Sequence, residues 1–309
     1  MQDTLEIRNI TETEIEIVLD LAAQEGWNPG LQDGPAFFAA DPNGFFCGLI
    51  RGLIVNVISV VRYSEDFGFV GSYICRHEYR AKGYGHQLWD RALLHLNGCK
   101  TIGLDAVYAQ TSSYASHGFV SSYRNVRYVG TSISVYPQDS RVVEVDSTIH
   151  ASLFGAILQY DTKIFLTERA NFLNYWLTTP TTNATNTTTA TATTATSTTT
   201  TSTHCSYVYI ENNVVRGYGT IRKCHTGYKI APLFADSLEI ADILFRTLSS
   251  TVNGEVISID IPEPNSSYTT VLVEQYKLAP VFETYRMYRG EALGLCLNKI
   301  YGITSFELG

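Results

Sequence analysis

Residues 80–85, RAKGYG, place two glycines and two cations where they could bind an anion. A short apolar run, residues 67–75, precedes them, and a run with helical periodicity begins at Gly83. At a junction between a strand and a helix, the first backbone amides of the helix converge, and the helix dipole favours a phosphate there. Glycine lets the backbone approach the anion, while Arg80 and Lys82 add local charge. The alternative is a glycine turn with two solvated cations.

The spacing of the glycines separates the known phosphate loops. The chain contains no G-x-x-x-x-G-K-[ST] string, which excludes a P-loop, and Leu88 stands where a dinucleotide fingerprint needs a third small residue. The pattern that remains, R-x-x-G-x-G, resembles the coenzyme A pyrophosphate loop of the GNAT (GCN5-related N-acetyltransferase) superfamily. Tyr73, Cys75 and His77 occupy positions typical of the family's L-x-V-x-P, and residues 114–119, YASHGF, are similar to its Y-x-x-x-G-F.

This resemblance implies acetyl-CoA as acyl donor and a set of residues that contact it. Family members bind the thioester where two parallel strands splay apart, which corresponds here to residues 73–76 and to Asp105 and Ala106. An amine attacks the carbonyl directly, and backbone amides stabilise the oxyanion. The cofactor-binding residues implied are Tyr73, Ile74, Cys75, Arg76, Arg80, Ala81, Lys82, Gly83, Tyr84, Gly85 and His86.

Tyr114 stands at the family position of the tyrosine that protonates the leaving thiolate, so the resemblance implies that it is the catalytic residue. The alternative is an aromatic side chain packed beneath Phe119. The preceding residues 106–114, AVYAQTSSY, depart from the family pattern, which has an asparagine and an alanine there.

No motif identifies a general base, and the candidates by charge are Glu65, Asp66, His77, Asp105 and His117. An acyl-cysteine route through Cys75 is a weaker hypothesis than a buried strand cysteine.

The elements around these residues predict a sheet of mixed direction. Thr11 and Glu14 have capping-box spacing before an apolar helical face. Residues 45–50, 53–63 and 67–76 are rich in β-formers, and a helix over 83–96 is followed by a strand over 101–107. Meandering strands that precede one β-α-β unit indicate an α/β (α+β) fold.

The second half resembles the degenerate acetyltransferase-like domain of two-domain GNAT proteins. The resemblance rests on strings such as VRGYG (215–219), APLFADS (231–237), DIPEPN (260–265) and PVFETYRMYRG (280–290). It implies a GNAT-type mixed, mostly antiparallel sheet with flanking helices, followed by a second, smaller GNAT-like domain. The predicted domains are 1–134, which binds acyl-CoA, and 135–309, interrupted by a disordered low-complexity threonine-rich loop over 178–203.

This second domain lacks a pyrophosphate loop, so we expect it to shape the acceptor pocket. The polar candidates are Asp260, Glu263, Asn265, Glu283 and Arg286, each of which is at least as easily explained as a cap or surface charge. The glycines of residues 216–219, RGYG, precede a strand-like run, which predicts no second phosphate site. His204-Cys205 and Cys224-His225 match no established zinc spacing, so no metal is expected.

Composition limits the partners. The 309 residues carry a formal net charge of −8, which argues against broad attraction to nucleic acid or anionic lipid. The N-terminal residues lack a signal-peptide pattern, no stretch is long and apolar enough for a membrane span, and the six cysteines form no C-x-x-C pair. We expect a cytoplasmic protein, with the nucleus as an alternative.

The predicted function is an acyl-CoA-dependent N-acyltransferase, most simply an acetyltransferase, that transfers the acyl group directly to a primary amine. A small-molecule amine is favoured over a protein lysine, because a second domain beside the first suggests a confined pocket. The alternative is an acyl-CoA-binding sensor or interaction protein without turnover.

Overall fold

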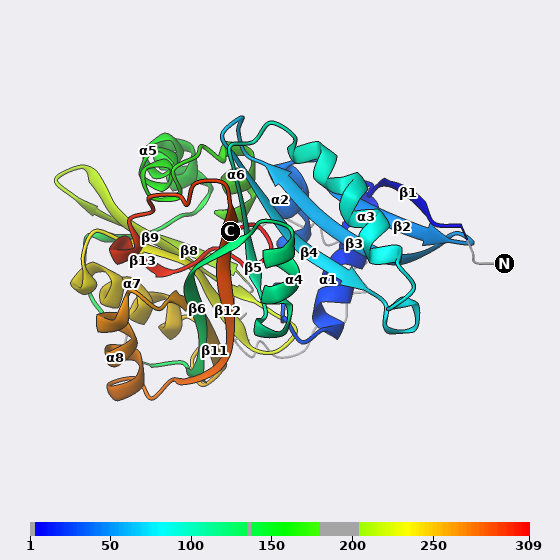
Figure 1. Ribbon diagram of the computed structural model, residues 1–309. Coiled ribbons are helices and arrows are strands. Elements are labelled where there is room, and N and C mark those ends of the chain that lie inside the picture. The colour runs from blue at the N-terminus through cyan, green and yellow to red at the C-terminus, as the bar shows by residue number, and fades with distance from the viewer. Residues whose placement is uncertain (1–3, 135–136, 179–203) are drawn as a thin grey trace, which may run out of the picture.

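The computed structural model describes residues 4–134, 137–178 and 204–309 (Figure 1). Apart from Thr178, the loop predicted over 178–203 lies outside the described residues. The strands are β1 (Glu6–Asn9), β2 (Phe45–Ile50), β3 (Leu53–Arg62), β4 (Phe67–Cys75), β5 (Thr101–Ala106), β6 (Val120–Thr131), β7 (Val142–Glu144), β8 (His204–Glu211), β9 (Val214–Lys223), β10 (Tyr228–Ala235), β11 (Val256–Pro262), β12 (Ala279–Arg289) and β13 (Ile300–Gly302). The helices are α1 (Ile15–Gln24), α2 (Asp33–Ala40), α3 (Tyr84–Leu93), α4 (Thr111–Ser116), α5 (Ser147–Phe165), α6 (Ala170–Trp176), α7 (Leu238–Ser250) and α8 (Ser266–Glu274).

The first half confirms the predicted order of elements. Thr11 and Glu14 form the capping box, and the α1 face that begins at Ile15 is buried. β2, β3 and β4 pair antiparallel, whereas β4 and β5 pair parallel on either side of α3, as the β-α-β pattern requires. The short helix α2, with the sequence DGPAFFAA, was not predicted, because it carries an internal glycine and proline and lacks a clear apolar period.

Helices cover both faces of the sheet. Side chains alternate along β2, so that Phe46 packs beneath α3 while its neighbours Phe45 and Cys47 face α1 and α2. The core on the α1 side continues into the second half through α5 and α6, where Phe37 stacks on Trp176 with ring centroids 6.1 Å apart. The two halves therefore share this core. A separate core lies under α7 and α8.

The strands of the two halves are interleaved. The sheet order is β1-β2-β3-β4-β5-β12-β6-β11-β10-β9-β8-β7, with β13 paired to β10. Strand β12 from the second half pairs with β5 and β6, and β6 in turn pairs with β11 (Figure 1). The predicted sequence boundary after residue 134 follows β6, so each predicted domain needs a strand of the other to complete its hydrogen bonding.

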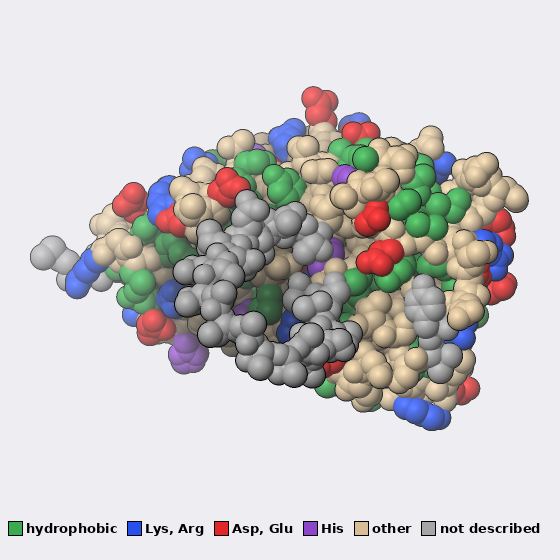
Figure 2. Space-filling model, turned by 180° about the vertical axis from the view of Figure 1, so that it is seen from behind, with side chains coloured by type: hydrophobic (Ala, Val, Ile, Leu, Met, Phe, Trp, Pro, Cys, Tyr) green, Lys and Arg blue, Asp and Glu red, His purple; other side chains and the backbone are tan. Residues whose placement is uncertain are grey.

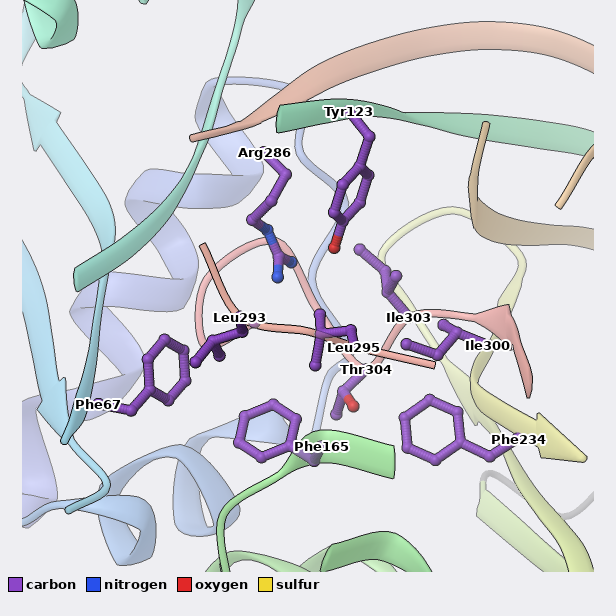
Figure 3. A pocket seen from close by; sticks show the side chains of 11 residues that line it. Phe67, Tyr123, Phe165, Phe234, Arg286, Leu293, Leu295, Ile300, Ile303 and Thr304 are labelled. Carbon is purple, nitrogen blue, oxygen red and sulfur yellow. The ribbon is translucent and has the colours of Figure 1, made fainter. Parts of the chain in front are cut away.

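Residues 300–309 run through the centre of the molecule, where the red end of the ribbon lies between the halves (Figure 1), and all ten are buried. Beside this segment lies a small apolar cavity of about 20 Å³, whose walls include Phe165 and Phe234 and into which Arg286 and Tyr123 point (Figure 3). This volume holds about one water molecule, which is too little for a substrate.

The surface mixes charges of both signs. On the face that Figure 2 shows, Lys and Arg side chains alternate with Asp and Glu side chains across the coloured atoms. Within the described ranges, no helix has the length and apolar character that crossing a membrane would require.

Candidate functional site

Strands β4 and β5 separate half-way along their length. They pair in parallel register from Phe67 with Thr101 to Val70 with Leu104, and the pairing ends there, although both strands continue. At the same point β4 carries a bulge against β3, where register shifts between the pairs Val57–Ile74 and Ser59–Gly71, so that Ser72 and Tyr73 oppose a single residue. Ser72 has a φ of 45°, so the bulge re-aims the strand as it leaves β5.

The C-terminal segment packs against β3 and β4 where the gap opens. A Cβ on Gly71 would lie 2.0 Å from the Glu307 carbonyl oxygen, so only glycine permits the approach. The Ser59 hydroxyl donates to the same oxygen at 3.3 Å, and the Tyr63 hydroxyl donates to the Leu308 carbonyl at 2.8 Å. The tail therefore fixes the position of β4 at the residue where the gap opens.

The glycine loop leads into α3 as a left-handed turn. Gly83 is the N-cap residue with a φ of 79°, and Ala81 also has a positive φ of 58°. The first turn of α3 contains no acidic residue, and Gly83 supplies no capping side chain to its amides. On the sheet side, Asn56 Nδ2 donates to the Tyr84 carbonyl at 3.0 Å, which ties the helix start to β3. These first-turn amides are the anion-binding groups of a helix N-terminus.

Tyr73 connects the loop to the strand gap. A Cβ on Gly85 would lie 2.7 Å from the Tyr73 hydroxyl, so the glycine makes room for that side chain. The Tyr73 ring lies 5.3 Å from the ring of Trp89 on α3. The loop, the gap and α4 thereby meet at one cavity.

That cavity has a volume of about 750 Å³ and adjoins a smaller pocket of about 80 Å³, which we call its deep end and which residues of β4, β5 and β12 help to line. Of the residues predicted from the sequence, those that line the larger part are Tyr73, Ile74, Cys75, Arg80, Ala81, Gly83, Gly85, His86 and Tyr114. The larger part and the deep end share the side chains of Trp27, Tyr73, Val107, Gln110, Tyr114 and Phe282.

The other three predicted residues make different contacts. Arg76 Nε donates to the Ile54 carbonyl at 2.8 Å, and the Lys82 ammonium lies 5.2 Å from the centroid of the Tyr79 ring. Tyr84 is buried beneath the loop. Their part in cofactor binding stays a prediction from the family motif.

Arg80 brings the positive charge to the cavity. Its Nε donates to the Cys75 carbonyl at 2.8 Å, which holds the guanidinium across the mouth of the loop. Its Nη2 pairs with the carboxylate of Glu25, the residue that ends α1. Glu25 was not predicted, because it follows α1 and is brought to the loop only by the fold.

Tyr114 on α4 lines both parts of the cavity. Its ring lies 5.6 Å from that of Trp89 and 6.2 Å from that of Phe119, so the predicted packing and the predicted place in the site occur together. Burial raises the pKa of the Tyr114 hydroxyl to about 12, so the phenol stays protonated at neutral pH.

Among the candidate bases, only Asp105 lines the cavity. Arg286 Nε and Nη2 donate to its two carboxylate oxygens at 2.9 and 2.8 Å, and Asn125 Nδ2 donates at 2.9 Å. Both carboxylate oxygens are therefore already engaged, and two of the three hydrogen bonds come from a buried cation. Asp66 pairs with Lys100 at the other end of β4, where Glu65 also lies, and His117 Nδ1 is 2.9 Å from the Ser113 carbonyl oxygen.

Cys75 lines the cavity, but burial raises the pKa of its thiol. A thiol is a weaker nucleophile than a thiolate, so the environment opposes an acyl-cysteine route. All six cysteines are free.

The second half contributes to the cavity through residues other than the five polar candidates. Those candidates are engaged in other contacts: Asp260 pairs with Arg127, Glu263 and Glu283 pair with Arg124, Asn265 donates to the Ile300 carbonyl, and Arg286 pairs with Asp105. Phe282 and Thr284 of β12 and Phe306 of the tail line the deep end instead. Phe282 and Thr284 are two residues apart in PVFETYRMYRG, which indicates that they share one face of a strand. The sequence gives no sign that this strand enters the other half of the sheet.

The second half has a similar gap between two parallel strands, but a third strand of the same half fills it. β10 and β11 pair in parallel from Tyr228 with Ile257 to Ile230 with Ile259, after which β13 pairs with β10. The helix that follows, α7, is capped by Ser237, whose hydroxyl accepts from Ile240 N at 3.3 Å, and no glycine loop precedes it. The RGYG string lies within β9. Among the described residues of this half, the gap between the parallel strands is therefore filled and has no glycine loop beside it.

The paired His-Cys dipeptides do not converge. In the β8–β9 register, His204 faces Arg222 and Cys205 faces Ile221. Within the described part of the chain, no group of three or more His, Cys, Asp or Glu side chains could hold a metal ion.

Comparison with known proteins identifies the fold around this cavity. The model of the "Acetyltransferase (GNAT) family" matches residues 1–120, and that of an "Acetyltransferase (GNAT) domain" matches residues 157–302. The chain is a two-domain GNAT acyltransferase. The holothin acyltransferase of Pseudoalteromonas sp. (strain SANK 73390) is 28% identical over 297 residues, which cover 96% of this chain and 92% of that protein.

Solved structures share the two-domain GNAT fold. A protein from Pyrococcus horikoshii that is assigned as an acetyltransferase superposes with a TM-score of 0.77 at 22% identity, over 100% of this chain and 97% of that one. A tandem GNAT protein from the clavulanic acid biosynthesis pathway superposes with a TM-score of 0.55 at 11% identity, over 94% and 100%. These likenesses establish the mixed, mostly antiparallel sheet with flanking helices as the fold of this GNAT protein.

Proposed function

We propose that this GNAT protein transfers an acyl group, most simply acetyl, from an acyl-CoA to the primary amine of a small molecule. The observation that carries the proposal is the single cavity in which the glycine loop, the β4–β5 gap and Tyr114 meet. A bound acyl-CoA would supply the thioester that the reaction requires.

The loop fits the diphosphate of coenzyme A. Nothing lies within 4 Å of the position of a Cβ on Gly83, so the space in front of the first α3 amides is open. Arg80 adds a guanidinium whose present partner is the Glu25 carboxylate, a group that an arriving diphosphate would have to replace. The residues we assign to this site are Arg80, Ala81, Gly83, Gly85 and His86.

The strand gap and Tyr114 are suited to direct transfer. Where β4 has left β5, those backbone amides of residues 72–75 that do not pair with β3 are available to stabilise charge on the acyl oxygen. The amine nitrogen forms a bond to the acyl carbon, the carbon–sulfur bond breaks, and the amine loses one proton to solvent. The leaving thiolate takes a proton from the Tyr114 hydroxyl, which solvent then restores. Burial raises the pKa of the Tyr114 hydroxyl to about 12, so the phenol still carries the proton that the thiolate takes.

A small acceptor is supported by the shape of the deep end and by the relative. The deep end has a volume of about 80 Å³, and the second half contributes Phe282, Thr284 and Phe306 to its walls. The curated relative is named for one acceptor, holothin, and its match covers both halves of this chain.

The test is calorimetric titration of acetyl-CoA into the parent protein and into Gly83→Asp, followed by a screen of primary amines for release of free CoA. Gly254→Asp is the matched control, because both glycines have a φ of 79° and open space around a Cβ, whereas only Gly83 lies in the loop. We expect binding to the parent and the control and none to Gly83→Asp. Binding without release of CoA by any amine would support the sensor alternative. No binding to the parent would refute the proposal.

A further inference from the structure

Two residues that line the deep end of the cavity carry buried hydroxyls without a hydrogen-bond partner. Ser72 Oγ and Thr284 Oγ1 are both unpartnered, and each residue is 2% exposed. Both residues line the deep end. Buried hydroxyls are normally hydrogen-bonded, because a hydroxyl removed from water without a replacement partner is unfavourable. Because two such hydroxyls belong to residues that line one pocket of about 80 Å³, we infer that their partner is a ligand group.

The two hydroxyls come from different halves of the chain and are held in place by backbone structure. Ser72 lies in the β4 bulge with a φ of 45°, and Thr284 lies on β12 opposite Asn125 of β6. A strand position and a bulge position restrict side-chain placement more than a loop would. The hydroxyls are therefore preorganised for a ligand.

The walls around them are aromatic. Trp27, Phe282 and Phe306 line the deep end, together with Tyr73 and Tyr114 at its entrance. Asp105 is the single charged side chain among the lining residues, and Arg286 pairs with it at 2.8 Å. Such a pocket favours a flat, uncharged body with one polar group and offers no cation to an anionic acceptor.

We propose that Ser72 and Thr284 bind a hydrogen-bonding group of the acceptor, such as a ring carboxamide, carbonyl or hydroxyl, and thereby select aromatic or heteroaromatic amines that carry it. This inference rests on the proposed function. It assigns the choice of acceptor to two residues, one from each half of the chain. A site built to pair with a polar group discriminates strongly against the analogue that lacks the group, because its own buried groups then stay unpaired.

Two other roles would leave different signatures. A hydroxyl with a structural role would lower stability when removed, whereas an unpartnered one would not. A hydroxyl that stabilises charge on the acyl oxygen would change the rate with every acceptor equally.

The test compares Thr284→Val, which keeps the shape and removes the hydroxyl, with Thr247→Val as a matched control. Thr247 is equally buried, but its hydroxyl donates to the Ile243 carbonyl at 2.8 Å, far from the cavity in α7. Acceptors are used in pairs that differ in one polar group: 3-aminobenzamide with aniline, and tyramine with phenethylamine. Acetyl-CoA is the donor, and CoA release gives kcat and KM.

For the parent we expect kcat/KM to be at least about tenfold higher for the polar member of a pair. Thr284→Val should lose that preference through KM, while its acetyl-CoA affinity stays within about twofold and its urea midpoint is not lowered. Thr247→Val should lower the midpoint and keep the preference. A parent without preference, a Thr284→Val variant slowed equally with both members, or a lowered Thr284→Val midpoint would each overturn the proposal.

A binding measurement makes the inference independent of turnover. Saturation-transfer NMR with benzamide and with toluene tests the hydroxyls even if none of the amines is acylated. Benzamide should bind more tightly than toluene to the parent, and the difference should disappear in Thr284→Val. Equal binding of the two compounds to the parent would refute the hydroxyl pair. Absent acetyl-CoA binding would instead refute the proposed function.

Discussion

Replacing Arg286 by Met should destabilise the whole protein, because this residue neutralises a buried carboxylate where the two halves meet. The Arg286 and Asp105 side chains are 4% and 0% exposed and share two hydrogen bonds of 2.8 and 2.9 Å. Removal of one partner of such a pair costs about 3–5 kcal/mol, because the other charge stays buried. A folded domain is stable by only about 5–15 kcal/mol, so the variant should be marginal.

The assay is urea unfolding of the parent, of Arg286→Met, of Asp105→Asn and of the double variant. With a slope of about 3 kcal/mol/M, a loss of about 4 kcal/mol lowers the midpoint by about 1.3 M. The double variant should recover most of this loss, since no unpaired charge remains and the new amide can still accept from Asn125. Lys100→Met is the control: it breaks an ion pair of 2.6 Å that is 78% and 68% exposed, and it should leave the midpoint unchanged.

Two results would refute this reasoning. If the losses of the single variants simply add in the double variant, the pair is not coupled. If Asp105→Asn keeps the parent midpoint but loses acyl transfer, the carboxylate acts in catalysis as the general base and not in the structure.

Further variants test the chemistry and the fold. Tyr114→Phe should lower kcat by about 10²-fold or more while the affinity for acetyl-CoA, measured by calorimetry, stays unchanged; an unaltered kcat would exclude the tyrosine as the proton donor. Cys75→Ala should keep acyl transfer within a few fold, and abolished transfer would point to an acyl-cysteine. Burial lowers the pKa of His204 to about 4, so between its unfolded pKa of about 6.5 and pH 4 only the unfolded chain gains a proton. The free energy of unfolding should therefore fall by up to about 3 kcal/mol as the pH is lowered over this range. Urea titration at each pH measures this fall, and His204→Gln should make it smaller. A fragment of residues 1–134 should not fold, because β5 and β6 both lose β12 as their neighbour, and a dispersed NMR spectrum of the fragment would contradict this.

Local signals in the sequence were sufficient for the first half of the sheet. Runs rich in β-formers around a short turn predicted β2 and β3, and the capping box predicted the start of α1. The RAKGYG string predicted a glycine turn at the N-terminus of α3, since a positive φ at Gly83 is a local requirement. Such features depend on neighbours within a few residues, which the sequence displays directly.

The deep end of the cavity could not be predicted in the same way. Phe282, Thr284 and Phe306 lie more than 150 residues from Tyr114 and reach it only because β12 pairs with β5. Glu25 and Trp27 reach the cavity from the end of α1. The polar residues that looked suitable in the second half, Asp260 among them, are bound in ion pairs whose partners the sequence could not name.

The sequence by itself determined the glycine loop of this protein, the strand and helix that hold the loop, and the family to which these belong. The tertiary structure alone decided the deep end of the cavity, because strand exchange between the halves is a long-range pairing whose register depends on the packed sheet and not on local residue pattern. It also decided that the second gap is closed by β13, and that the tail behind Gly71 supports the first. A local motif can be read from a few neighbouring residues, whereas contacts between distant segments exist only after the chain has packed.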